Sequence, residues 1–79
     1  MTIVVRLFGR YRDLSPQEAI SVELGEGARV RDLVAALHAR GMEALPERPV
    51  VAVNLSPAPD DQMLKSSDEV ALIPPAAGG

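Results

Sequence analysis

Two glycines, Gly78 and Gly79, end the sequence, and we expect the terminal carboxylate of Gly79 to be the group that does chemistry. Glycine has no Cβ, so its backbone can enter a slot that is too narrow for any other residue. Pro74 and Pro75 precede them, fix their own φ angles and favour an extended path. We therefore predict a folded domain over residues 1–74 and an extended tail over residues 75–79 with the carboxylate at its tip.

A diglycine end can also be a frayed terminus without a role, since free chain ends often lack packing. Its position argues against that interpretation. The tail follows directly after an apolar, strand-like run over residues 70–73 and the pair Pro74-Pro75. Two prolines at the end of a strand would aim the tail away from the domain. We interpret Gly78, Pro74 and Pro75 as residues that let the tail thread into a partner protein.

No other group in the chain indicates a catalytic or metal site. His38 is the one histidine and cysteine is absent, so thiolate chemistry and a His/Cys metal site are excluded. The acidic pairs at residues 60–61 and 68–69 lie in polar stretches, where we interpret them as turn residues. Residues 25–27 lack the third glycine of a nucleotide-binding fingerprint. We expect no bound metal or cofactor, and no catalysis by this domain alone.

The composition indicates one small domain with an aliphatic core. The chain has 79 residues, of which 47% are hydrophobic and only 3% aromatic. Its net charge of −3 and its scattered arginines leave no basic surface for nucleic acid. No apolar run approaches the roughly 20 residues of a membrane span. Secreted domains of this size usually need disulfides, so the absence of cysteine favours the cytoplasm.

Hydrophobic periodicity predicts the order strand, strand, helix, strand, strand. Alternation indicates strands over residues 2–8 and 19–24, joined by a polar loop over residues 9–16. The apolar run over residues 50–53 is typical of a strand that is buried on both faces or lies at a sheet centre. Residues 69–73 indicate the last strand, with Val70 and Leu72 on one face and Ala71 and Ile73 on the other.

One amphipathic helix is predicted between the second and third strands. Its apolar stripe recurs at helical spacing and consists of Val30, Leu33, Val34 and Leu37. Gly41 suits the C-cap, whereas Ala28 or Arg29 is a poor N-cap. A helix with one apolar stripe must cover one face of a sheet. We therefore predict an α+β fold, the ubiquitin-like β-grasp roll, with a mixed sheet whose first and last strands are parallel neighbours.

The sheet face opposite the helix carries a second signal. By alternation, the apolar residues on that face are Val4, Phe8, Ala71 and Ile73. A single helix leaves this face open to water, and an exposed apolar patch often marks a partner surface. Scattered exposed apolar residues are also normal, which is the alternative interpretation. We predict that these four residues bind a partner protein.

Residues 67–79, Ser-Asp-Glu-Val-Ala-Leu-Ile-Pro-Pro-Ala-Ala-Gly-Gly, resemble the C-terminus of the molybdopterin synthase small subunit family. That family's signature is close to Gly-Asp-Glu-Val-Ala, two apolar residues, Pro-Pro, two variable residues and Gly-Gly. Residues 7–9 and 12–13, the helical stripe over residues 30–37 and residues 52–54 are similar to the family more loosely.

The resemblance implies a sulfur carrier. A ubiquitin-activating-type adenylyltransferase would use ATP to adenylate the Gly79 carboxylate, and sulfur from a donor protein would replace AMP to give a thiocarboxylate. The loaded tail would enter the large subunit of molybdopterin synthase, which holds the catalytic residues, in an assembly of two small and two large subunits. There the sulfur would attack a cyclic pterin phosphate precursor in molybdenum cofactor biosynthesis.

Three alternatives stay open at this point. The chain could carry sulfur for thiamine or for transfer-RNA thiolation, whose carriers share the diglycine but show the rest of the signature less faithfully. It could be a protein modifier that forms isopeptides through Gly79. It could also be an interaction module whose tail has no role.

Overall fold

A computed structural model describes residues 1–42 and 45–74 of the chain. Five strands, one α-helix and one 3₁₀ helix follow one another in it: β1 (Thr2–Leu7), η1 (Gly9–Leu14), β2 (Ala19–Glu23), α1 (Val30–Ala39), β3 (Val50–Val53), β4 (Ser56–Pro57) and β5 (Val70–Ile73). No helix among these residues is long and apolar enough to cross a membrane.

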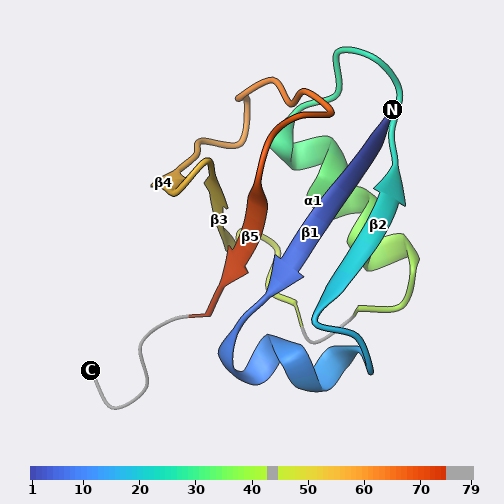
Figure 1. Ribbon diagram of the computed structural model, residues 1–79, viewed down its shortest axis with the longest axis vertical. Helices are drawn as coiled ribbons and strands as arrows, with labels where there is room; N and C mark the ends of the chain where they lie inside the picture. Colours follow the sequence, from blue (N-terminus) through green and yellow to red (C-terminus); the bar gives the residue numbers. More distant parts are fainter. Residues whose placement is uncertain (43–44, 75–79) are drawn as a thin grey trace.

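The strands form one mixed sheet in the order β2-β1-β5-β3-β4. β1 pairs antiparallel with β2 and parallel with β5, and β5 pairs antiparallel with β3. α1 packs across one face of this sheet, behind the strands in Figure 1. The parallel contact between the first and last strands confirms the predicted crossover, and the whole arrangement is the expected ubiquitin-like β-grasp roll.

The core lies between the sheet and α1. Along β1 the burial alternates without a break, so Ile3, Val5 and Leu7 face the helix while the residues between them face outward. The apolar stripe of α1 is buried in full, as its spacing predicts: Val30, Leu33, Val34 and Leu37. No buried polar or charged side chain occurs among the described residues. Hydrophobic burial, at about 25 cal/mol per Å², is therefore the main stabilising term.

The first turn of α1 is capped by backbone groups from a distant loop. Arg29 stands at the N-cap and has no side-chain oxygen to accept a hydrogen bond. Instead, the Val30 N–H donates to the Gln62 carbonyl at 2.9 Å, and the Arg31 N–H donates to the Asp60 carbonyl at 2.9 Å. The weak local cap that the sequence shows is thus compensated by tertiary structure, since orphan donors at a helix start need only some acceptor. Gly41 follows the helix with a φ of +94°, which confirms its predicted place at the C-terminal end.

Three local predictions are wrong. The segment predicted as a polar loop contains η1, which forms around Tyr11, a residue that is only 3% exposed. For β3, burial on both faces is the wrong one of the two alternatives, because Val50 is 50% exposed; β3 is an inner strand of the sheet, between β5 and β4. A short strand, β4, was not predicted; it pairs with β3 through a tight turn in which Asn54 and Leu55 both have positive φ angles.

Candidate functional site

The sheet face opposite α1 is open and apolar, as predicted. Phe8 is 45% exposed and Ile73 is 37% exposed, while Ala71, two residues before Ile73 on β5, is partly buried. Their neighbours Leu7 and Leu72 are at most 2% exposed and lie on the helix side. The predicted division between the two faces of the sheet is therefore confirmed.

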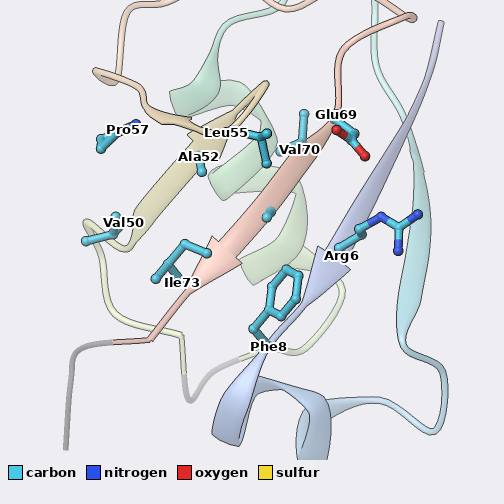
Figure 2. Close-up of a pocket in the computed structure, with 10 residues that line it drawn as sticks. Arg6, Phe8, Val50, Ala52, Leu55, Pro57, Glu69, Val70 and Ile73 are labelled. Atoms are coloured by element: carbon cyan, nitrogen blue, oxygen red, sulfur yellow. The ribbon is translucent and has the colours of Figure 1, made fainter.

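A groove runs across this face over β1, β5, β3 and the β3–β4 turn (Figure 2). It encloses about 630 Å³. The residues that line it are Arg6, Phe8, Val50, Ala52, Leu55, Pro57, Glu69, Val70, Ala71 and Ile73. The groove brings together three of the four predicted partner residues: Ala71 and Ile73 lie on β5, and Phe8 directly follows β1, the strand that pairs parallel with β5.

Val4 is the predicted partner residue that the groove does not include. It is 48% exposed and lies on the same face, opposite Ser21 of β2. β5 pairs with β1 only from Val5 onward, so Val4 lies beyond the part of β1 that the groove occupies. We therefore treat Val4 as peripheral to the groove.

Several groove residues were not predicted from the sequence. Val50 and Ala52 alternate with buried Val51 and Val53, so they line the groove from β3. Leu55 adds a side chain that is 90% exposed, held in the turn with a φ of +70°. A bulky residue with positive φ is uncommon and energetically costly. An apolar side chain displayed this fully in a strained turn is what a docking surface requires, and it would be a poor choice for solubility alone.

Two charged side chains lie at the margin of the groove. Figure 2 shows Glu69 at the upper end of β5 and Arg6 on β1, close to Phe8. The other side chains that line the groove are apolar. An apolar centre with a polar rim is the usual composition of a protein–protein interface.

Pro74 continues from β5 and lies over Gly9, the first residue of η1. A Cβ built on Gly9 would be 2.8 Å from Pro74 Cγ, and Gly9 has a φ of +54°. Pro74 is partly buried, so it belongs to the folded domain. Three other predicted site residues, Pro75, Gly78 and Gly79, lie outside the described residues.

The other groups considered from the sequence have structural roles. The His38 Nε2 is 2.9 Å from the Leu45 carbonyl, a contact in which the ring N–H donates and ties the helix to the connector that follows it. The Asp68 carboxylate accepts hydrogen bonds from the Lys65 N–H and the Asn54 amide. Within residues 1–42 and 45–74, no three acidic or histidine side chains cluster as a metal site would need. The feature that distinguishes the described part of the chain is therefore the open apolar groove.

A β-grasp roll with an apolar groove on its helix-free face, next to the start of a diglycine tail, defines a ubiquitin-like carrier class of domain. The sequence profile of the ThiS family matches residues 5–79. The chain belongs to the ThiS family.

Similar proteins agree with this assignment. A Chlamydomonas reinhardtii protein named molybdopterin synthase sulfur carrier subunit is 36% identical over 84 residues, covering 100% of both chains. A Pyrococcus furiosus protein described as molybdopterin converting factor subunit 1 is 31% identical, with a TM-score of 0.80 over 95% of this chain and 98% of that one. Subunit 1 in a complex of subunits 1 and 2 of the Helicobacter pylori molybdopterin-converting factor is 25% identical, with a TM-score of 0.72 and full coverage of both chains.

The same fold occurs in a protein modifier. Haloferax volcanii SAMP1 matches with a TM-score of 0.84 over the full length of both chains, but at 24% identity. This likeness shows the shared roll alone.

Proposed function

We propose that this chain is the sulfur carrier subunit of a molybdopterin synthase and works in the cytoplasm. The observation that carries the proposal is the match along its whole length to the Chlamydomonas carrier subunit. The C-terminal signature of residues 67–79 supports it, because the diglycine end is where a carrier of this type holds its sulfur.

The chemistry belongs to the Gly79 carboxylate and to enzymes that act on it. A free carboxylate is a poor electrophile, so an adenylyltransferase first joins it to the α-phosphate of ATP and pyrophosphate leaves. A sulfur donor protein then supplies the nucleophile that displaces AMP, which leaves a thiocarboxylate on Gly79. In the large subunit this sulfur attacks the cyclic pterin phosphate precursor, and water that cleaves the resulting thioester returns the carboxylate. Two carriers in turn supply the two sulfurs of the dithiolene.

The groove is the proposed docking site for the large subunit. Phe8 and Ile73 project from adjacent strands at the end of the sheet from which Pro74 leaves, so a partner bound there would receive the tail close by. In the Helicobacter pylori structure, subunit 1 is in complex with subunit 2. We propose the corresponding assembly here, with two small and two large subunits.

Mass spectrometry tests the proposed function directly. The protein purified from its own cells, or incubated with its adenylyltransferase, sulfur donor and ATP, should gain the mass of one oxygen-to-sulfur exchange. Fragmentation should place that gain on Gly79. A protein modifier would instead give branched peptides in which Gly79 is joined to lysines of other proteins, and this outcome would overturn the proposal.

Phe8→Asp should weaken binding to the large subunit by at least about tenfold. Burial of one such side chain contributes about 1.5–3 kcal/mol, and each factor of ten in affinity corresponds to about 1.4 kcal/mol. Because Phe8 is 45% exposed in the free domain, the charged side chain can remain in water and the fold should persist. Isothermal titration calorimetry with the purified large subunit gives the affinity, and the melting temperature reports the fold.

Met63→Asp is the matched control. Met63 is another exposed apolar residue, at 55%, but it lies near the start of α1 and does not line the groove. It receives the same new charge and should bind as the unaltered protein does. Equal affinities for Phe8→Asp and the unaltered chain would remove the groove from the proposed interface.

A further inference from the structure

We propose that Gly9 is a positioning residue for the tail: it seats Pro74 and thereby sets where the tail begins and in which direction it starts. This inference rests on the proposed function and adds a residue outside the tail to the sulfur-transfer machinery. It assigns Gly9 no contact with substrate.

The geometry at Gly9 excludes any side chain. The built Cβ would be 2.8 Å from Pro74 Cγ, whereas ordinary van der Waals contact begins at 3.4 Å. The obstructing atom belongs to a proline ring next to the backbone of the chain end, so it cannot rotate away as a flexible side chain would. A substitution at Gly9 must therefore move Pro74 by more than half an ångström, or tilt it.

Gly9 also lies at the junction between the groove and the 3₁₀ helix η1. Phe8, directly before it, projects into the groove, and η1 begins at Gly9 itself. The Tyr11 N–H donates to the Phe8 carbonyl at 3.0 Å, and the Tyr11 side chain is buried, so this turn is fixed to the core. Pro74 is seated on a rigid turn that is built into the domain. The start of the tail consequently has a support that is fixed to the core.

Such a support matters because the tail has to place one carboxylate in two partner active sites. Displacement of a reacting group by about 1 Å can slow an enzymatic step by up to about a hundredfold. The docking groove does not include Gly9, so binding to the large subunit should not depend on the contact between Gly9 and Pro74. A change at Gly9 should therefore act on the rate within the complex and leave complex formation intact.

The test measures sulfur transfer from the loaded carrier to the precursor with the large subunit, for Gly9→Ala and Pro74→Ala. We expect kcat to fall about tenfold or more in Gly9→Ala, with KM for the carrier unchanged. Pro74→Ala removes the Cγ atom that contacts Gly9. It should also lower kcat, and it adds no backbone strain at position 9. In the double variant the two effects should not multiply, because one contact is lost in both. NMR should show that the nuclear Overhauser contacts between Gly9 and Pro74 change in each single variant.

Gly27→Ala is the control for backbone strain. Gly27 also has a positive φ, +79°, but a Cβ there would meet nothing within 4 Å. Gly27→Ala should lower the melting temperature through backbone strain alone, by no more than Gly9→Ala does, and keep kcat. Three outcomes would overturn this inference while the wild type is active. The first is an unchanged kcat in Gly9→Ala, and the second is a rise in KM alone. The third is a double variant in which the two effects on kcat multiply. An inactive wild-type carrier would overturn the proposed function, and this inference with it.

Discussion

Deletion of Gly79 should abolish sulfur transfer and leave the stability of the domain nearly unchanged. The carboxylate of the shortened chain would belong to Gly78 and end one residue, about 3.3 Å, short of the position that each partner active site requires. The buried side chains of the described domain extend no further along the chain than Leu72, so the core does not depend on residue 79. Free chain ends contribute little to stability when they are not packed.

Three measurements separate loss of function from loss of structure. Mass spectrometry should find no thiocarboxylate on the shortened chain after incubation with the activating enzymes and ATP. Calorimetry should give an unchanged affinity for the large subunit, because the groove is intact. The melting temperature should stay within about a degree. A large drop in melting temperature would mean that the tail is structural, contrary to the proposed division into domain and tail.

The sequence predicts the core of this fold because its strands and helix are strictly periodic. In β1 the polar residues Thr2 and Arg6 mark the solvent face, so a period of two assigns each side chain of that strand to a face. β5 is apolar throughout, and its faces follow from its pairing with β1. The helical stripe from Val30 to Leu37 predicts the covered face for the same reason. These two patterns agree with each other, and the structure confirms both.

The half of the groove that lies on β3 and the β3–β4 turn could not be predicted in this way. The run from Val50 to Val53 contains no polar residue to mark a solvent face, so exposure of Val50 has no signal in the sequence. Leu55 stands in a turn where a polar residue or glycine would be usual. In both places an apolar side chain is exposed. Hydrophobicity predicts that such a side chain is buried, but it does not distinguish burial in the domain core from burial against a partner.

Local sequence patterns also could not predict contacts between segments that are distant in the chain. The carbonyls that cap α1 come from Asp60 and Gln62, roughly thirty residues away in sequence, and no propensity links them to Val30. The seat of Pro74 on Gly9 joins opposite ends of the chain. Gly9 carries a visible signal only as a glycine after a strand, which is equally typical of an ordinary turn.

Gly78→Val should block loading of the carrier or its sulfur transfer. A β-branched side chain restricts φ and adds bulk one residue before the reacting carboxylate. In the proposed mechanism this part of the chain enters the active sites of both partners, so the substitution should act on both steps. ATP–pyrophosphate exchange measures adenylation, and mass spectrometry measures the thiocarboxylate. We expect both signals to fall by about a hundredfold, since misplacement next to the reacting atom carries a cost of that order.

Ala77→Val is the matched control, because it adds a branched side chain one residue earlier, at a position that the family's signature leaves variable. It should be loaded at close to the normal rate. A Gly78→Val chain that is adenylated normally but fails to transfer sulfur would restrict the narrow path to the large subunit. Normal rates of adenylation and of sulfur transfer in Gly78→Val would show that neither partner requires glycine at position 78. Gly79 would then be the one residue of the diglycine that function requires.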